Sequence, residues 1–365
     1  MRARTAMAAA GTVVLLASAA PAAAGAARVA PVNRGAPATT GAATGAVRDR
    51  VIARRSPRAR AAVGVGATHA YRTADGVSIE VQLSQSFADT EENRAGAQSF
   101  VDFLATRLHG SELGKLRMFI GMPGEVNAQC GGDSGVQACY VEDERRMYVP
   151  STDPGGGSSP FTREYVMTHE YGHHIAAYRR NDPFSAINLG PKYWSSYKLV
   201  CAGVFGGRYF PGNQGAHYLD DPGEGWADGY AHLHFPAAPF QFNRGFAPDA
   251  GTFAAIRRDV LTPWNGPATR RVRRTLSSRH RVTSTTSRLT LDGTVALTLS
   301  GPRRANYDLQ VVENGRVVGQ TRTAGSRDRI AGTVCRGHPG AAGITFRVRR
   351  RSGSGPFSLR ISTAG

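Results

Sequence analysis

The sequence predicts an α+β domain, with a mixed sheet and a central helix, followed by a small all-β sandwich. Residues 71–267 contain both strand-like and helix-like runs of apolar residues, which is typical of an α+β domain. Residues 268–365 contain short alternating runs separated by Gly-, Pro- and Asn-Gly turns, which is typical of an antiparallel sandwich. A chain of 365 residues is long enough to bury both cores.

The N-terminal residues 1–25 have the pattern of an export signal peptide. A basic start is followed by an apolar segment from Met7 to Ala20 and then by small residues suited to cleavage. The apolar segment is too short for a mature anchor, and no other run of 18 apolar residues exists. We therefore expect a secreted, extracellular protein without a transmembrane segment. The alternative is a mobile Ala-rich tail of a cytosolic protein.

Residues 26–70 are rich in Ala, Gly and Arg and carry hardly any large apolar side chain. Such a composition cannot bury enough surface to offset the entropy lost on ordering. We expect a disordered linker or a short pro-segment here. The Arg54-Arg55 pair is a weak candidate for a processing site, because the stretch is rich in arginine throughout.

The elements of the α+β domain can be assigned in chain order. Apolar periodicity and turn residues predict strands at 77–83, 116–120 and 138–149, and helices at 92–108, 160–180, 222 onward and 252–261. Residues 184–216 are expected to form a helix followed by a long loop. The strand at 138–149 is a candidate for a sheet edge along which an extended peptide pairs, or for an interior strand.

The helix at 160–180 contains the sequence His169-Glu170-Tyr171-Gly172-His173-His174. Two histidines four residues apart lie on one face of a helix, so His169 and His173 can offer neutral imidazole nitrogens to the same Zn²⁺. Glu170 can then accept a proton from a water on the metal without being a ligand itself. The alternative is a helix with surface histidines and a solvated glutamate.

A catalytic zinc needs a third protein ligand and an open fourth position. Downstream, Asp221 has the pattern of an N-cap, Pro222 of a first helical residue and Glu224 of the third position. Glu224 and Asp228 are four residues apart and share one helix face. We predict Glu224 as the third ligand, with Asp228 accepting the other N–H of a ligand histidine.

These two motifs resemble the gluzincin type of zincin metallopeptidases, whose pattern is H-E-x-x-H followed by E-x-x-x-D. The resemblance implies a zincin-like catalytic domain with His169, His173 and Glu224 on zinc, Glu170 as general base and Asp228 behind His169. The chain departs from the thermolysin group, because Gly223 precedes Glu224 and 51 residues separate Glu224 from His173. The resemblance therefore reaches only the superfamily. The rival assignment has Asp228 as the ligand, as in aspzincins.

Several aromatic and histidine residues flank the helix of Glu224, among them Tyr218, His232 and His234. One of these flanking residues could donate to the oxyanion of a tetrahedral intermediate, and Tyr230 and His217 are the first to test. Each is more readily explained as a packed or hydrogen-bonded structural residue.

Four cysteines in an exported chain predict two disulfides. Cys130 and Cys139 flank a Gly-rich loop and form the first expected pair. Cys201 and Cys335 are left by elimination, and their bond would connect the two domains. No cysteine has the spacing of a zinc ligand set.

The C-terminal region, 268–365, has expected strands at 289–299, 307–312, 316–320, 344–348 and 357–361. The segments Tyr307–Gly315 and Gly353–Leu359 loosely resemble bacterial pre-peptidase C-terminal domains, modules that accompany secreted peptidases.

The net charge of +18 is concentrated outside the α+β domain. Residues 268–365 hold 19 arginines against four acidic residues. Such a surface favours anionic partners such as cell-wall polymers or phospholipid surfaces, although a GC-rich genome would give the same arginine-rich composition. Specific nucleic-acid recognition is not expected, because no recognition motif accompanies the charge.

The sequence therefore predicts a secreted zinc metallopeptidase that hydrolyses peptide or protein substrates. Two alternatives share its motifs: a zinc hydrolase of non-peptide amides in the cell wall, and a non-catalytic, basic surface-binding protein with a zincin fold.

Overall fold

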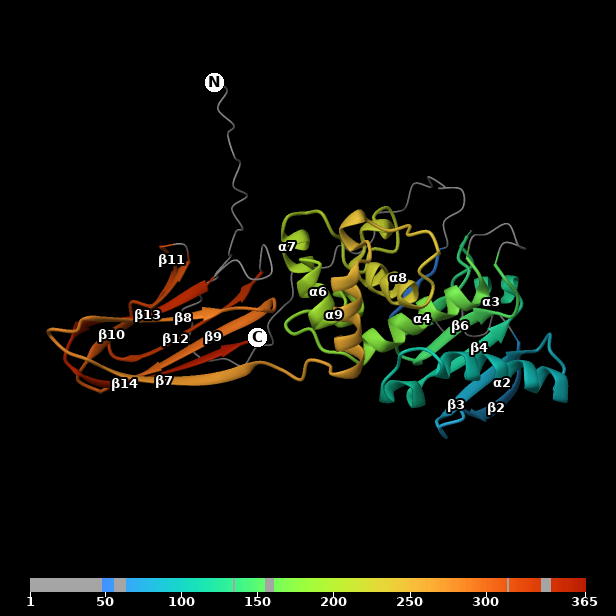
Figure 1. The fold of residues 1–365 in the computed structure, drawn as a ribbon, viewed down its shortest axis with the longest axis horizontal. Helices are drawn as coiled ribbons and strands as arrows, with labels where there is room; N and C mark the ends of the chain where they lie inside the picture. Colours follow the sequence, from blue (N-terminus) through green and yellow to red (C-terminus); the bar gives the residue numbers. More distant parts are fainter. Residues whose placement is uncertain (1–47, 56–63, 134, 155–160, 314, 336–342) are drawn as a thin grey trace, which may run out of the picture.

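The computed structural model describes residues 48–55, 64–133, 135–154, 161–313, 315–335 and 343–365. The predicted signal peptide, 1–25, and most of the predicted linker lie outside these ranges. Figure 1 shows a β-sheet at one end of an elongated molecule, helices in the middle and a β-sandwich at the other end. The first sheet has six strands. The chain is thus a mixed α/β part followed by an all-β part. This division agrees with the coarse fold class predicted from the sequence.

The first sheet is mixed, with the strand order β1-β5-β6-β4-β3-β2. The β1–β5, β4–β6 and β3–β4 pairs are parallel. The β5–β6 and β2–β3 pairs are antiparallel. The strands are β1 Val51–Ile52, β2 Val65–Arg72, β3 Ser78–Ser84, β4 Arg117–Gly121, β5 Cys139–Val141 and β6 Arg146–Pro150.

Two predictions for this sheet are wrong. Residues 138–149 form two strands, because a turn at Glu142–Arg145, in which Arg145 has a φ of 53°, reverses the chain between β5 and β6. In the predicted disordered linker, 26–70, residues 51–52 form β1 and residue 65 begins β2. Backbone pairing to β5, together with packing of Val51 and Ile52 against the cores on the two faces of the sheet, orders β1.

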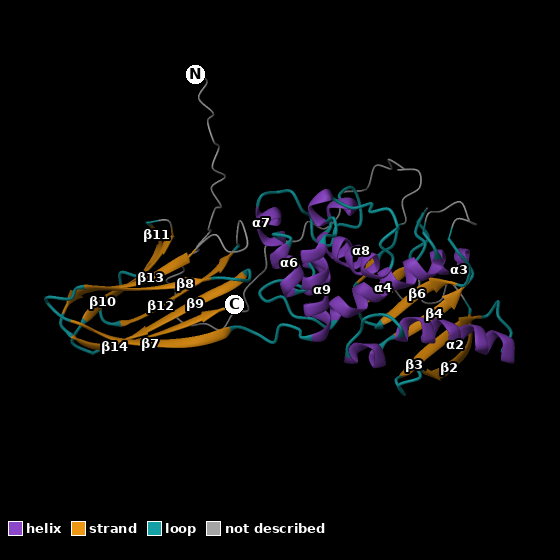
Figure 2. Cartoon of the chain, in the orientation of Figure 1, coloured by secondary structure: helices purple, strands orange, loops and turns teal. Residues whose placement is uncertain are grey.

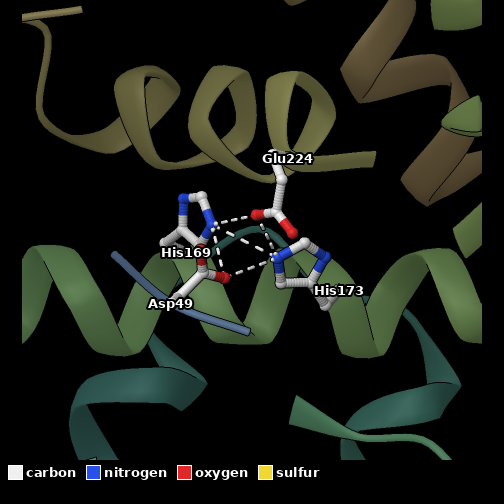
Figure 3. A group of neighbouring side chains, drawn as sticks. All are labelled: Asp49, His169, His173 and Glu224. Carbon is white, nitrogen blue, oxygen red and sulfur yellow. Dashed lines mark hydrogen bonds and ion pairs between the residues drawn. The ribbon is translucent and has the colours of Figure 1, made fainter. Parts of the chain in front are cut away.

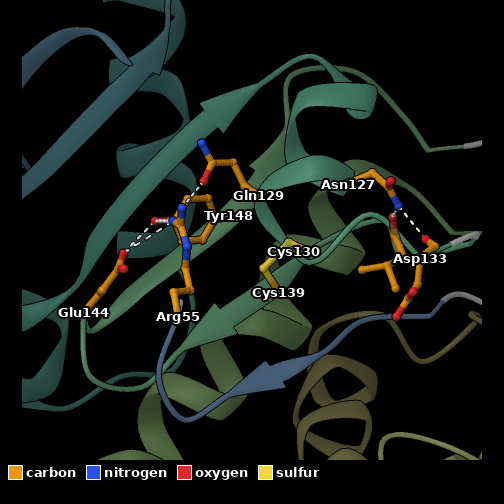
Figure 4. Close-up of a disulfide and its surroundings, with 9 residues drawn as sticks. Arg55, Asn127, Gln129, Cys130, Asp133, Cys139, Glu144 and Tyr148 are labelled. Carbon is orange, nitrogen blue, oxygen red and sulfur yellow. Dashed lines mark hydrogen bonds and ion pairs between the residues drawn. A yellow bond between two sulfur atoms is a disulfide. The ribbon is translucent and has the colours of Figure 1, made fainter. Parts of the chain in front are cut away.

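Successive residues of the sheet point to opposite faces, and each face has its own core. Met118, Ile120 and Tyr140 belong to the large core shared with the helices, whereas Phe119 and Cys139 belong to a smaller core on the other face. The Cys130–Cys139 disulfide closes this smaller core against α3 (Figure 4).

Helices cover the sheet and form the centre of the molecule (Figure 2). Residues 184–216 were predicted to form one helix followed by a long loop; the structure has three short helices there, followed by a loop. The α-helices are α2 Glu91–Ala105, α3 Pro123–Gln129, α4 Arg163–Ala177, α5 Ala186–Leu189, α6 Lys192–Tyr197, α7 Val200–Phe205, α8 Pro222–His234 and α9 Ala250–Leu261. Among the described residues, no helix is long and apolar enough to cross a membrane.

The C-terminal part consists of two four-stranded antiparallel sheets with the orders β11-β10-β13-β8 and β12-β9-β14-β7. Inward-facing residues of both sheets, such as Leu309, Phe346, Leu297 and Leu359, form one core. The strands are β7 Ala268–Leu276, β8 Val282–Arg288, β9 Gly293–Ser300, β10 Asn306–Glu313, β11 Arg316–Gln320, β12 Arg327–Val334, β13 Gly343–Ser352 and β14 Gly355–Thr363. Strands β7, β8 and β12, whose apolar residues are few, were not predicted.

The sandwich is connected to the helical part by polar contacts and a covalent bond. The buried Lys192 donates to the carbonyl of Asp292 at 3.0 Å, and Trp264 donates to the carbonyl of Ala364 at 2.8 Å. The Cys201–Cys335 disulfide joins α7 to the end of β12, as expected from the sequence.

Candidate metal centre

Helix α4 presents His169 and His173 on one face, one turn apart (Figure 3). The Thr162 side chain caps its N-terminus by accepting from the Tyr165 N–H at 3.2 Å. The residues from Tyr165 to Ala176 are all buried, because the sheet covers one side of the helix and α8 the other. The helix that the motif predicted is therefore the buried centre of the domain, and the reading of His169 and His173 as surface histidines is wrong.

Helix α8 supplies Glu224. Its start is the one predicted: Asp221 is the N-cap and accepts from the Gly223 N–H at 2.9 Å, and Pro222 is the first helical residue. The two helices approach closely where Gly172 faces Ala227, and a Cβ at Gly172 would lie 2.9 Å from the Ala227 Cα. This close crossing brings the Glu224 carboxylate over the two histidines.

The fourth member of the cluster, Asp49, was not predicted. It comes from the segment just before β1, inside the predicted linker, and it is only 4% exposed. Its Oδ2 lies 3.1 Å from His169 Nε2 and 3.0 Å from His173 Nε2. It is the single acidic residue between positions 26 and 65, which is the one signal in the sequence that could have singled it out.

The donor atoms have the spacing of a tetrahedral metal site. His169 Nε2 lies 3.2 Å from His173 Nε2, and Glu224 Oε2 lies 3.3 and 3.1 Å from these two nitrogens. Ligands at about 2.0–2.1 Å from Zn²⁺ at the corners of a tetrahedron are about 3.3–3.4 Å apart. Asp49, His169, His173 and Glu224 are thus a buried group that could hold a metal ion.

The electrostatics of the cluster also favour a cation. Burial alone would lower the pKa of His173, but Glu224 and Asp49 raise it to about 10. Burial would likewise raise the pKa of Asp49, but His169 and His173 hold it well below its usual range. The two carboxylates therefore stabilise positive charge between them, and a divalent ion can replace the histidine protons in that role.

Glu170 is fully buried, and neither of its carboxylate oxygens has a hydrogen-bond partner among the described residues. Burial raises its pKa well above the usual range, and the negative charge of Asp49 adds to the shift. Buried carboxylates are ordinarily hydrogen-bonded or paired, because desolvation is costly. An unpaired one beside four candidate ligands fits a group that exchanges protons with a molecule in the site.

Asp228 lies behind the cluster. Its Oδ1 accepts from the Tyr165 hydroxyl and is 3.8 Å from His169 Nδ1, which is longer than a hydrogen bond. Its Oδ2 lies 3.5 Å from His232 Nδ1. The arrangement brings Asp228 toward His169 without placing it among the four candidate ligands, which favours Glu224 over Asp228 as the third ligand.

The two candidates for a transition-state stabiliser do not contact the cluster. The Tyr230 hydroxyl donates to the carbonyl of Leu108 at 2.5 Å, and His217 stacks on Phe210 at the surface. Tyr218, another residue flanking α8, does reach the cluster: its hydroxyl donates to Asp49 Oδ1 and accepts from the Asp49 N–H at 3.2 Å.

Comparisons with known proteins leave the family of this chain open. No family model matches the sequence, and no curated protein matches it. Among solved structures, a Yersinia pseudotuberculosis-derived mitogen is 15% identical and matches 27% of this chain and 86% of its own length, with a TM-score of 0.21. The Aeromonas hydrophila protein PliG, a periplasmic inhibitor of g-type lysozyme, is 14% identical over 27% of this chain and 87% of its own, with a TM-score of 0.19. Scores this low do not establish a shared fold.

Proposed function

We propose that this chain is a secreted zinc-dependent endopeptidase of the zincin type. His169, His173 and Glu224 would hold the zinc, and Glu170 would be the general base. The observation that carries the proposal is the buried Glu170, which has no hydrogen-bond partner among the described residues and adjoins a tetrahedral set of nitrogen and oxygen donors. A metal that only stabilises the fold does not need such a group.

When bound, zinc polarises a carbonyl and lowers the pKa of a water toward about 7. The protein contributes the remaining steps through its own side chains. Glu170 accepts the proton of the attacking water and then delivers it to the leaving amine, for which its raised pKa is suited. The dry surroundings, with His173 and Glu224 fully buried, strengthen each electrostatic interaction in the site.

The extracellular location is part of the proposal. The sequence of residues 1–25 has the pattern of an export signal, and two disulfides fit an oxidising compartment. The resemblance to secreted peptidases agrees with both.

A non-catalytic role is favoured by one specific observation. Four protein side chains converge on the candidate metal position, and structural zinc sites are closed in this way, whereas catalytic sites keep one position open. In that reading the chain is a basic surface-binding protein stabilised by a metal. Hydrolysis of non-peptide amides in the cell wall would use the same residues as peptide hydrolysis.

Removing the metal with a chelator and then adding Zn²⁺ back distinguishes the peptidase, the amidase and the structural metal site. We expect hydrolysis of fluorescent casein to disappear when the metal is removed and to return on addition of one equivalent of Zn²⁺. Release of soluble fragments from purified cell walls, without casein hydrolysis, would favour the amidase. A loss of thermal stability on chelation, with no hydrolysis of either substrate by the intact chain or by the chain cut within residues 57–62, would favour the structural site.

A further inference from the structure

Residues 48–55 occupy two places that a substrate of the proposed enzyme would need. They lie along the free side of β5, and they bring Asp49 into the metal cluster. They also belong to the part of the chain that composition predicts to be a linker or a pro-segment. Both contacts bear on how the site is regulated.

The first place is the edge of the sheet. The Arg48 carbonyl accepts from the Gln137 N–H at 2.9 Å, the Arg50 carbonyl from the Tyr140 N–H at 3.0 Å, and the Ile52 carbonyl from the Glu142 N–H at 2.9 Å. Without this segment β5 would be an edge strand with these donors free. An edge strand beside a hydrolytic site is a natural place for an extended peptide to pair.

The other place that the segment occupies is the metal cluster, where it supplies the fourth candidate ligand. A hydrolytic zinc needs its fourth position for water and for the substrate carbonyl. Asp49 Oδ2 fills it at 3.0–3.1 Å from both histidine Nε2 atoms. The ligand is a side-chain carboxylate, so the segment offers no scissile peptide bond at the metal.

The Asp49 carboxylate also resembles the product of peptide hydrolysis. One of its oxygens, Oδ2, lies at the candidate metal position, and the other, Oδ1, accepts from the Tyr218 hydroxyl. In peptide hydrolysis the Tyr218 hydroxyl would be placed to donate to an oxygen that develops negative charge, as an oxyanion-hole donor does.

Arg55 anchors the far end of the segment. Its guanidinium donates to the Tyr148 hydroxyl and to Gln129 Oε1, and it lies 3.7 Å from Glu144 Oε2 (Figure 4). It is 6% exposed, so Arg55 itself is shielded and the Arg54-Arg55 pair is poorly placed as a processing site. The segment is thus held at both ends, by Asp49 in the cluster and by Arg55 on the sheet.

We propose that residues 48–55 are an inhibitory segment, in which Asp49 is the fourth metal ligand and the backbone blocks the substrate-binding edge of β5. The inference rests on the proposed function. Release of the segment opens one metal position, frees the Tyr218 hydroxyl and exposes β5. The intact chain is then a latent form of the enzyme.

The experiment uses the full chain with a recognition sequence for a specific endoprotease placed in residues 57–62, so that the protein folds with the segment seated and is cut afterwards. Casein hydrolysis and the visible absorption of the Co²⁺-substituted protein are measured before and after the cut. We expect the fragment to dissociate, the Co²⁺ spectrum to change and hydrolysis to rise at least about tenfold, as for a site blocked more than about nine-tenths of the time.

Asp49→Asn in the uncut chain gives an independent test with the same expected changes in spectrum and activity. Asp133→Asn is the matched control, because the Asp133 carboxylate pairs with Arg50 of the same segment at the surface and is 61% exposed. Asp133→Asn should leave the Co²⁺ spectrum and casein hydrolysis as they are in the uncut wild type.

Failure of the inhibitory role and failure of the proposed peptidase function give different results in this experiment. A Co²⁺ spectrum unchanged by both the cut and Asp49→Asn would overturn the assignment of Asp49 as a ligand. Equal hydrolysis by the uncut, cut and Asp49→Asn proteins would overturn inhibition and retain the peptidase. A changed spectrum without hydrolysis by any form would reject the peptidase and, with it, the inhibitory role.

Discussion

At the scale of single residues, Glu170 is the side chain on which the proposal of a reactive site, as opposed to a structural one, depends. An isolated ionised carboxylate in the protein interior is costly, and replacing it with an apolar residue would remove that cost. Glu170 is fully buried, and the described residues give its oxygens no hydrogen bond. The proposed role of Glu170 as general base would account for this cost, because a general base works best when its pKa is raised toward the working pH.

The identity of the third ligand can be tested with two substitutions. We expect Glu224→Ala to lower zinc retention during dialysis, because Glu224 Oε2 lies 3.1 Å from His173 Nε2. Asp228→Ala should weaken retention less, by about 10–100-fold in affinity, as is usual for a group that only orients a ligand. Metal content after dialysis against a weak chelator gives the comparison. If Asp228→Ala empties the site while Glu224→Ala does not, the rival assignment holds.

The role of Tyr218 can be measured in the enzyme from which the inhibitory segment has been released. We expect Tyr218→Phe to lower kcat by about 10²–10³-fold with little change in KM, as for loss of an oxyanion donor. Tyr230→Phe is the matched control, because its hydroxyl donates to the Leu108 carbonyl instead. That variant should lose about 1 kcal/mol of stability and retain kcat. Equal kcat in both variants would exclude Tyr218 from catalysis.

At the scale of elements, the sequence contained strong local signals for the two helices that carry the cluster. The start of α8 follows from Asp221 and Pro222, and the histidine spacing of α4 follows from helix geometry. Asp49 could not be predicted in this way. It lies 120 residues before His169, and the strand beside it has only two residues. Its position depends on pairing with β5, which is a tertiary contact that local patterns do not encode.

The turn between β5 and β6 and the strand β7 could not be predicted either, because local sequence patterns do not encode tertiary contacts. The sequence of β7 is dominated by exposed arginines and lacks an apolar face of its own, so its strand form depends on pairing with β14. The inward-facing residues of β9, β10 and β14 alternate clearly, and these strands were predicted. Strands β9, β10 and β14, which carry several inward-facing apolar residues, were therefore predictable, whereas the arginine-rich β7 was not.

The crossing of α4 and α8 gives a prediction for an element contact. A Cβ at Gly172 would lie 2.9 Å from the Ala227 Cα and 3.2 Å from its Cβ, so Gly172→Ala must push the helices apart. We expect a loss of about 1–3 kcal/mol of stability, as for an overpacked core, together with weaker zinc binding because Glu224 moves away from the histidines. Thermal unfolding with and without zinc measures both effects.

Gly96 provides the control for this substitution. It is exposed in the middle of α2, and a Cβ there would meet nothing within 4 Å. Gly96→Ala should therefore stabilise the protein by about 0.5–1 kcal/mol and leave zinc binding unchanged. Unaltered zinc affinity in Gly172→Ala would show that the close crossing does not set the geometry of the cluster.

At the scale of the whole molecule, the two parts differ in charge. The outer face of the sheet β12-β9-β14-β7 carries exposed arginines on neighbouring strands: Arg271 is opposite Arg360, Arg360 is opposite Thr298, and Thr298 is opposite Arg329. The acidic residue of these strands, Asp328, is buried. This arginine face is the specific surface behind the proposed affinity for anionic polymers.

The arginine face can be tested on a sulfated-polysaccharide column. We expect the wild type to bind at low salt and to elute as the ionic strength rises, because interactions at exposed charges are screened. The triple substitution of Arg271, Arg329 and Arg360 by Gln should elute at clearly lower salt. Substitution of the exposed Arg72, Arg94 and Arg257 outside the sandwich removes the same charge and should have a smaller effect. Equal shifts for both triples would indicate that only net charge matters.

The central claim is that the cluster around His169 and His173 is a catalytic zinc site with Glu170 as its base. The most direct measurement compares wild type and Glu170→Gln, both freed of the inhibitory segment, for zinc content and casein hydrolysis. We expect one zinc per chain in both proteins and a loss of at least about 10²-fold in kcat in the variant alone. Normal turnover by Glu170→Gln, or the absence of zinc from a folded wild-type protein, would contradict it.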